Sequence, residues 1–266
     1  LARKGEGDVT WPGKIKWFAK SSGTTNAKSK FIPISQESLE DCHYSAGKMM
    51  FALYLNAVPD TNIFIHKNLR IGGSSELYQK YDTRFGDLSA ILIDNLPFYA
   101  EMKNIPNKEI SLMTEWEAKI EAIYKSVVHE DVGSLTGVPS WMLVMLNYIL
   151  DKTGKNYVDE LWPNLEVFFH GGISYTPYAE NYKAITTKTL NYFEIYNASE
   201  GFFGIQDQRN CKDLLLLLDN GIFYEFIPMD EFGSENQSYL NIAQVEVGKN
   251  YAMVITTNGG LWRYII

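Results

Sequence analysis

Apolar residues recur at three- and four-residue steps in three stretches of the chain, a spacing that places them on one face of a helix. The stretches are 35–53, 116–127 and 139–153. The second is preceded by Thr114, which with Glu117 has the spacing of a capping box. The third starts with a proline in its first turn and is followed by Gly154, a residue typical of a helix end. Three amphipathic helices are therefore expected.

Short apolar runs between these helices are typical of buried strands. A further helical segment, 178–187, separates the apolar runs 165–169 and 191–196. Strands and helices alternate in this way up to about residue 206, which predicts an α/β layer, with a mixed sheet and flanking helices. The expected strands are 15–19, 61–68, 165–169 and 191–196.

The pattern changes after residue 206, where apolar runs flank short turn sequences. Asn220 and Gly221 separate two runs within 213–228, and the segment 258–260 separates two runs within 251–266. An Asn-Gly pair between apolar runs favours a β-hairpin. The sequence thus predicts two domains: an α/β nucleotide- and acyl-binding core over 1–206 and a β-hairpin-rich subdomain over 207–266.

Composition indicates an ordered globular protein, because 45% of the 266 residues are hydrophobic and 21% are charged. The net charge of −8 and the lack of a basic stripe argue against binding to nucleic acid. No apolar run approaches the roughly 18 residues of a membrane span, so no membrane partner is expected. Cys42 and Cys211 have neither metal nor redox spacing, and we expect reduced thiols and a cytoplasmic location.

A cluster of hydroxyl residues follows the first expected strand. Ser21, Ser22, Gly23, Thr24 and Thr25 stand together, and three lysines surround them: Lys20, Lys28 and Lys30. Successive backbone amides near a glycine form an anion-binding nest, and the hydroxyls and lysines add donors and charge. The cluster fits a phosphate-binding loop, although a serine-rich surface loop has the same composition.

Two further loops leave expected strands with chemically useful residues. In the first, His170 is followed by Gly171, Gly172, Ile173 and Ser174, and paired glycines allow a flat group to stack on the backbone. The alternative is a tight turn into the next helix.

The other loop contains Tyr196, Ser199 and Glu200, followed by Gly201. One carboxylate together with substrate phosphates suits Mg²⁺, although a lone loop glutamate is more often solvated. Ligands of open α/β sheets gather at the carboxyl ends of strands, and all three loops leave such ends. Their joint occurrence therefore favours one shared site.

The order of several segments resembles the auxin-responsive Gretchen Hagen three family of acyl acid amido synthetases, within the adenylate-forming superfamily. The resemblance extends from about residue 11 to 266. The segments are "SSGTT" (21–25), "LWPNLEVFFHGGISYTPY" (161–178), "YNASEGFFGI" (196–205), "YEFIPMDEF" (224–232) and "YAMVITTNGGLWRY" (251–264).

This resemblance implies ATP and Mg²⁺ as cofactors. It assigns the segment 21–25 to the ATP phosphates, with Thr24 and Glu200 in catalytic roles and Glu200 as the magnesium ligand. The remaining ATP-binding residues that it implies are Gly171, Gly172, Ile173, Ser174, Tyr196 and Ser199. Trp141 and Met145 are expected in the acyl pocket by position alone.

The implied activity is ATP-dependent adenylation of a small-molecule carboxylic acid, followed by acyl transfer to an amino acid amine. Two alternatives stay open: an acyl-CoA ligase-type adenylating enzyme, and a non-catalytic relic or binding module on the same fold. In the family, a Gly-Asp pair that holds the ribose and a C-terminal cap domain follow the position of Ile266. We expect both beyond this sequence, and the segment alone to be inactive.

Overall fold

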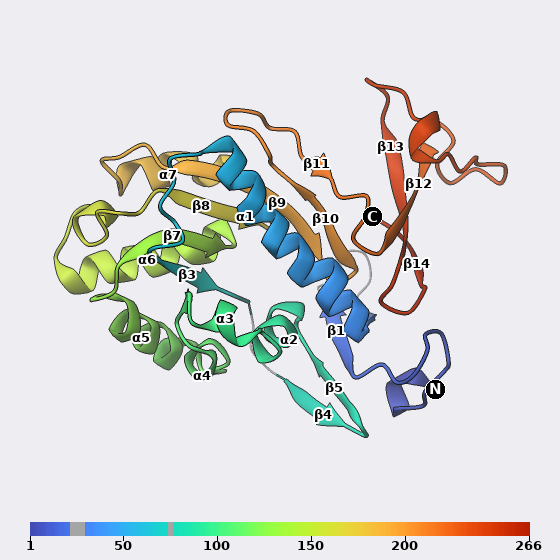
Figure 1. Ribbon diagram of the computed structural model, residues 1–266, viewed down its shortest axis with the longest axis horizontal. Helices are drawn as coiled ribbons and strands as arrows, with labels where there is room; N and C mark the ends of the chain where they lie inside the picture. Colours follow the sequence, from blue (N-terminus) through green and yellow to red (C-terminus); the bar gives the residue numbers. More distant parts are fainter. Residues whose placement is uncertain (22–29, 74–76) are drawn as a thin grey trace.

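Three β-sheets organise the chain in the computed structural model, which describes residues 1–21, 30–73 and 77–266 (Figure 1). The largest has seven strands in the order β11-β10-β9-β8-β7-β3-β6. Strands β6, β3, β7, β8 and β9 run parallel, whereas β10 and β11 are antiparallel to their neighbours. The strands are β3 (Lys67–Ile71), β6 (Asn104–Ile105), β7 (Val132–Gly137), β8 (Val167–Gly171), β9 (Asn191–Ala198), β10 (Gly201–Ile205) and β11 (Leu215–Leu216).

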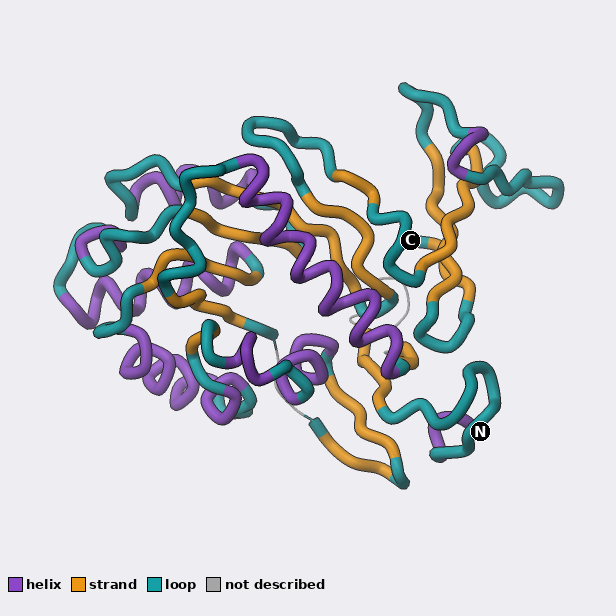
Figure 2. The backbone as a smooth tube through the Cα atoms, in the orientation of Figure 1, coloured by secondary structure: helices purple, strands orange, loops and turns teal. Residues whose placement is uncertain are grey.

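Helices cover both faces of this sheet. Neighbouring residues of a buried strand point to opposite sides, so both faces carry apolar side chains that the helices bury. Phe168 packs into the core formed with α5 (Trp116–Val127), α6 (Pro139–Thr153) and α7 (Ala179–Ala184). Phe169 packs into a second core with α1 (Ser45–Ala57), which crosses the other face. The mixed sheet with flanking helices confirms the fold class expected from the sequence (Figures 1 and 2).

Two smaller sheets flank the large one. The first has the order β2-β1-β5-β4, and the second, β12-β13-β14, is antiparallel and lies apart at the right of Figure 1. Ser35 joins them by donating a hydrogen bond to the backbone oxygen of Asn258 at 2.8 Å. Their strands are β1 (Trp17–Ser21), β2 (Lys30–Ile34), β4 (Tyr78–Lys80), β5 (Thr83–Gly86), β12 (Ile222–Pro228), β13 (Tyr251–Thr257) and β14 (Arg263–Ile265).

Short helices make most of the remaining connections. One of them, η2, has π-helical hydrogen bonding and leads directly into α1. Within the described parts of the chain, every helix is too short or too polar to traverse a bilayer. The short helices are η1 (Ala2–Lys4), η2 (Ser38–Tyr44), α2 (Leu88–Asp94), α3 (Phe98–Glu101), α4 (Lys108–Ser111), η3 (Val158–Glu160), η4 (Thr176–Tyr178) and η5 (Ile242–Gln244).

The helix boundaries confirm some sequence signals and correct others. Gly154 ends α6 in the left-handed conformation, with φ of 67°, as expected. The Ser35 hydroxyl accepts from the amide of Ser38, so this expected cap is also present. The prediction of a capping box at Thr114 is wrong, because the carboxylate of Glu115 accepts the hydrogen bonds from the first amides of α5. A carboxylate at this position reaches the same donors as a hydroxyl and also favours the helix dipole.

Only one of the two expected hairpins forms. Strands β13 and β14 pair around the turn at 258–260, as predicted. The prediction of a hairpin within 213–228 is wrong. Strand β11 pairs with β10 and β12 pairs with β13, and these pairs belong to different sheets. The side chain of Asn220 gives the reason: it is buried and donates to the backbone oxygen of Phe202 at 2.7 Å. This contact anchors the Asn-Gly turn to β10, so that the chain passes from one sheet to the other.

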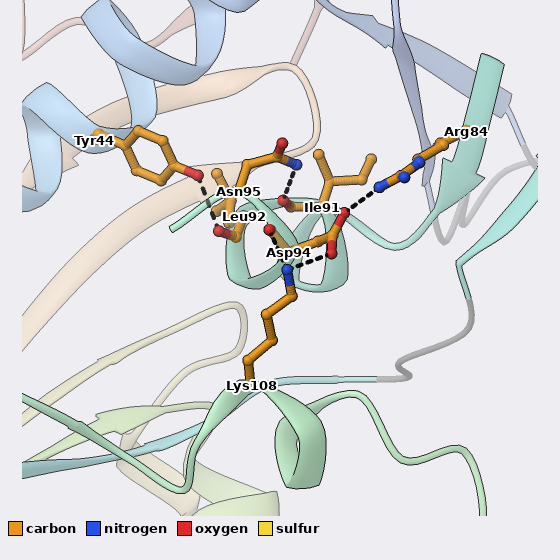
Figure 3. Close-up of polar contacts among 7 residues, drawn as sticks. All are labelled: Tyr44, Arg84, Ile91, Leu92, Asp94, Asn95 and Lys108. Atoms are coloured by element: carbon orange, nitrogen blue, oxygen red, sulfur yellow. Dashed lines mark hydrogen bonds and ion pairs between the residues drawn. The ribbon is translucent and has the colours of Figure 1, made fainter. Parts of the chain in front are cut away.

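A carboxylate with two cationic partners holds α2 in place (Figure 3). Asp94 is 2.5 Å from the guanidinium of Arg84 and 2.7 Å from the ammonium of Lys108. Lys108 also donates to the backbone oxygen of Asp94, and the Tyr44 hydroxyl donates to that of Leu92. Helix α2 is thus tied to β5, α4 and η2.

Replacing Asp94 by alanine is expected to lower the free energy of unfolding by about 2 kcal/mol, because it leaves two cations without their shared partner. The Asp94 side chain is only 14% exposed, so water does not replace the lost contacts fully. Urea unfolding at pH 7 measures the change. Glu180→Ala is the control, because its ion pair with Lys183 is exposed. Equal losses in the two variants would contradict the anchoring role of Asp94.

Candidate active site

Strand β8 ends in two glycines that local packing requires. A Cβ atom on Gly171 would lie 2.4 Å from the backbone oxygen of Ile195, well inside any real contact. Gly172 has φ of 83°, a conformation that residues with side chains rarely adopt. Ile173 and Ser174 follow and are exposed. The structure therefore presents the predicted loop at the carboxyl end of β8 with its backbone accessible to a ligand.

Aromatic stacking holds Tyr175, the residue at which this loop ends. The ring of Tyr175 lies 4.9 Å from the ring of His170 and 4.5 Å from that of Tyr192. Burial lowers the pKa of His170 to about 4, so its imidazole is neutral at pH 7. His170 therefore acts as a stacking partner that shapes the loop and cannot carry a positive charge toward a phosphate.

The second predicted loop is the tight turn between β9 and β10. Ala198 pairs with Gly201 across the turn, so Ser199 and Glu200 occupy its tip. A Cβ atom on Gly201 would lie 2.7 Å from Cδ1 at the flexible end of the Ile222 side chain, which would have to shift to admit it. Tyr196 is 41% exposed, and its ring packs against Phe203 at 5.1 Å. The turn thus packs against β10 and β12, while Ser199 and Glu200 remain partly exposed.

The two loops lie at the same edge of the sheet. Strands β8 and β9 are parallel neighbours, and Gly171 pairs with Ile195. Gly172 to Ser174 therefore leave the sheet beside the segment that begins at Tyr196. On the other side of β8, a Cβ atom on Gly172 would lie 3.3 Å from Val138, which follows β7. The sequence prediction that these loops meet at one carboxyl edge is consistent with this register.

The charge of Glu200 acts on two tyrosines, Tyr196 and Tyr264. Burial raises the pKa of Tyr196, and the charge of Glu200 raises it further. The same two causes raise the pKa of Tyr264, which comes from β14. Glu200 itself is half-buried and makes no hydrogen bond or ion pair with the residues that the structure describes. Sequence reasoning did not assign Tyr264 to the site, and only its place in the segment 251–264 pointed to it.

The residues present fit a magnesium site of the kind that substrate phosphates complete. Mg²⁺ commonly binds one or two carboxylates and takes its other ligands from phosphates and water. Glu200 offers one such carboxylate, and none of the described cations pairs with it. The described ranges contain no cluster of three or more His, Cys, Asp or Glu side chains suited to a metal. A cation at Glu200 would thus depend on a bound nucleotide.

The predicted phosphate loop is described only at its first residue. Ser21 is the last residue of β1 and pairs with Lys30 of β2. Ser22, Gly23, Thr24 and Thr25 lie outside the described residues, as does Lys28. Their assignment to the ATP phosphates stays a prediction.

The two residues expected in the acyl pocket occupy different environments. Met145 is 1% exposed and packs in the core between α6 and the large sheet. Trp141 is partly exposed, and its ring meets that of Trp116 edge to face at 5.2 Å. Neither lines the apolar cavity of about 460 Å³ that lies beside α1 and is lined by His43, Gly47 and Phe51. Their assignment to an acyl pocket stays a prediction.

Two buried histidines make stability depend on pH. Burial lowers the pKa of His43 and of His170 to about 4, from an ordinary value of 6.5. Between pH 6.5 and 4 the unfolded chain binds protons that the folded chain does not, so the free energy of unfolding falls as the pH falls through this range. Above pH 6.5 the contribution of these two histidines to the free energy of unfolding no longer changes with pH. We expect each histidine to account for a loss of about 2 kcal/mol between pH 7 and pH 5.

Urea unfolding at several pH values tests this expectation. His43→Leu should remove about half of the pH dependence between pH 7 and 5. His129→Leu, at an exposed position, is the matched variant that also replaces one imidazole by leucine. The same slope in wild type and His43→Leu would show that His43 does not titrate in this way.

The fold and this sheet edge define an α/β protein with a mixed central sheet and glycine-containing loops at its carboxyl edge. The chain belongs to the GH3 family: residues 2–190 match the GH3 family N-terminal domain and residues 215–266 match the GH3 family central domain. This confirms the resemblance to the Gretchen Hagen three family seen in the sequence.

Solved structures show the same architecture. The AtGH3.15 acyl acid amido synthetase in complex with 2,4-DB superposes with a TM-score of 0.78 at 16% identity, covering 99% of this chain and 55% of that one. A long-chain-fatty-acid-CoA ligase (FadD1) from Archaeoglobus fulgidus reaches a TM-score of 0.50 at 14% identity, covering 91% of this chain and 41% of that one. At these identities the likeness concerns the fold.

Curated relatives are plant enzymes. Indole-3-acetic acid-amido synthetase GH3.4 of Arabidopsis thaliana is 35% identical over 169 residues, which cover 59% of this chain and 28% of the relative. Indole-3-acetic acid-amido synthetase GH3.3 of the same plant is 33% identical over 121 residues, covering 43% of this chain and 20% of the relative. The chain therefore matches well under two thirds of the length of these enzymes.

Proposed function

We propose that the chain forms the nucleotide- and acyl-binding part of an ATP-dependent acyl acid amido synthetase. One observation carries the proposal: the loop after β8 and the turn after β9 leave the large sheet side by side at its carboxyl edge. Family membership supports it, since the relatives GH3.3 and GH3.4 are amido synthetases. The substrates would be a small carboxylic acid, as the names of those relatives suggest, together with ATP and an amino acid.

Activation of the acid overcomes its poor leaving group. A carboxylate oxygen attacks the α-phosphorus of ATP, and pyrophosphate leaves with the bonding electron pair. The amine nitrogen of an amino acid then attacks the carbonyl carbon of the acyl-adenylate, AMP leaves, and the nitrogen loses a proton as the amide forms. No protein nucleophile is required. Most of the acceleration would come from positioning the reactants and from stabilising charge on the phosphates.

Each part of the site has a role in this scheme. The backbone from Gly171 to Ser174 would lie along adenine, and Tyr196 and Ser199 would border the nucleotide. The segment 21–25 would bind the ATP phosphates through its amides and hydroxyls, with Thr24 in a catalytic role. Glu200 would hold Mg²⁺, which neutralises phosphate charge when bound.

The division of the chain and its location complete the proposal. We propose a boundary near residue 206, which the gap between the two matched family domains, 190 to 215, supports. We also propose a cytoplasmic location, in keeping with the two unpaired cysteines, Cys42 and Cys211. The net charge of −8 fits small-molecule partners rather than nucleic acid.

ATP–pyrophosphate exchange with a panel of carboxylic acids tests the proposed function, using protein produced from the complete gene. At least one acid should stimulate exchange, and adding amino acids should yield an amide with release of AMP. Coenzyme A is supplied in a parallel reaction. A thioester product in place of the amide would identify a CoA ligase, and no exchange with any acid would indicate a binding module.

A further inference from the structure

The backbone of the turn between β9 and β10 sets the direction of the Glu200 side chain. Glu200 forms no hydrogen bond or ion pair with the residues that the structure describes, so none of their side chains orients its carboxylate. It stands at the tip of the turn, two residues before Phe202. The pairing of the two strands changes register between Phe202 and Gly204, as at a β-bulge. The regular strand ladder therefore does not by itself fix the backbone near the carboxylate.

Two buried side chains from distant segments bind the backbone of Phe202. The amide of Phe202 donates to Cys42 Sγ at 3.3 Å, and its carbonyl oxygen accepts from Asn220 Nδ2 at 2.7 Å. Asn220 Nδ2 also donates to Cys42 Sγ at 3.7 Å, and both residues are 1% exposed. In the described part of the chain, β11 pairs with Gly204 and Ile205 and stops short of Phe202. The two side chains thus take the place of a neighbouring strand at Phe202.

Each of these side chains is itself held in place. Cys42 belongs to η2, and burial raises the pKa of its thiol to about 11, so the sulfur accepts as an uncharged group at pH 7. Asn220 precedes Gly221, whose carbonyl oxygen accepts from the amide of Asn258 at 2.9 Å. The contacts of Phe202 therefore connect β10 to η2 and to the turn that precedes β14.

We propose that Asn220 and Cys42 are positioning residues for Glu200. By binding both backbone groups of Phe202, they fix the chain that carries the turn and so the direction of the Glu200 carboxylate. Loss of contacts that orient a metal ligand commonly lowers metal affinity by about 10- to 100-fold. The inference rests on the proposed function for the role of Glu200 as the Mg²⁺ ligand. Asn220 has the larger effect of the two, because sulfur is a weak acceptor.

Asn220→Leu tests the inference, because leucine is similar in size but donates no hydrogen bond to Phe202. Asn191→Leu is the matched control. Asn191 is the first residue of β9, at the end of the strand away from the turn, and it donates to the Tyr54 hydroxyl at 3.0 Å. Cys42→Ala is a second test variant on a different element, and Cys42→Ser gives the Phe202 amide an acceptor again. Circular dichroism establishes that each variant is folded.

Isothermal titration with a non-hydrolysable ATP analogue, with and without Mg²⁺, is the measurement, using protein produced from the complete gene. The quantity compared is the magnesium gain, the factor by which Mg²⁺ increases the affinity for the analogue. Asn220→Leu should lower the magnesium gain by about 10-fold or more and leave the affinity without metal unchanged. Asn191→Leu should keep the wild-type gain. Cys42→Ala should lower the gain, and Cys42→Ser should restore most of it.

The same titrations in a Glu200→Gln background show whether Asn220 acts through Glu200. There Asn220→Leu should change the magnesium gain by less than about twofold, because the ligand that it positions is already lost. An equal loss in both backgrounds, an equal loss in Asn191→Leu, or an unchanged gain in folded Asn220→Leu overturns the inference. If Asn220→Leu does not fold, an unchanged gain in Cys42→Ala overturns it.

The inference and the proposed function fail in different ways. A magnesium gain that depends on Asn220 and Glu200, without pyrophosphate exchange for any acid, contradicts the proposed function and supports the positioning role. Exchange stimulated by an acid, together with a magnesium gain that Asn220→Leu leaves unchanged, supports the proposed function and overturns the positioning role.

Discussion

Replacing Glu200 by alanine is expected to reduce magnesium-dependent ATP–pyrophosphate exchange by about 100-fold, because the carboxylate is the proposed protein ligand of Mg²⁺ at the phosphates. The fold should be unaffected. Glu200 is half-buried and forms no hydrogen bond or ion pair with the part of the chain that the structure describes, so its loss breaks no internal contact. Exchange rates measured over a range of Mg²⁺ concentrations should show a higher metal requirement in Glu200→Gln, which keeps the side-chain size.

Glu235→Ala provides the control for loss of one negative charge. Glu235 is exposed in the segment between β12 and β13, and its replacement should leave both exchange and the metal requirement unchanged. Exchange in Glu200→Ala within a factor of two of wild type would refute the metal-binding role.

Replacing Gly171 by alanine is expected to destabilise the protein by about 3 kcal/mol and to abolish exchange. The new methyl group would lie 2.4 Å from the backbone oxygen of Ile195 and 2.9 Å from its Cγ1 atom. The nearest obstacle is backbone, so the clash can be relieved only by separating β8 from β9. That movement displaces the loop after β8 from the turn that carries Glu200.

Gly47→Ala in α1 is the matched control for this variant, because a Cβ atom there meets nothing within 4 Å. Chemical unfolding and circular dichroism compare the two proteins. A Gly171→Ala variant with an unchanged free energy of unfolding would mean that β8 and β9 tolerate a wider spacing at this edge. The assignment of the loop to adenine would then lose its structural basis.

Local sequence signals sufficed where a single residue decides the backbone conformation. Gly154 ends α6, and Gly172, which follows β8, adopts a positive φ that favours glycine. The alternation of buried strands and amphipathic helices gave the α/β fold, since each apolar run fills one layer of a core. The candidate loops after β8 and β9 were found for the same reason: polar and glycine residues follow directly on buried strands.

Contacts between residues distant in sequence account for what could not be predicted. The Asn220–Gly221 turn has the local chemistry of a hairpin, yet Asn220 bonds to Phe202 and directs β12 into another sheet. His43 and Gly47 occupy ordinary positions of an amphipathic helix, and only the packing of α1 against its neighbours leaves a cavity beside them. Tyr264 belongs to β14 and Glu200 to the turn between β9 and β10, in different sheets. No sequence spacing could indicate that the charge of Glu200 acts on Tyr264.

A crystal structure of the protein from the complete gene, with Mg²⁺ and a non-hydrolysable ATP analogue, tests the central claim most directly. The account predicts adenine against the backbone of 171–174, and the cation within coordination distance of Glu200. A nucleotide bound elsewhere, or one whose phosphates and cation lie away from Glu200, would contradict it.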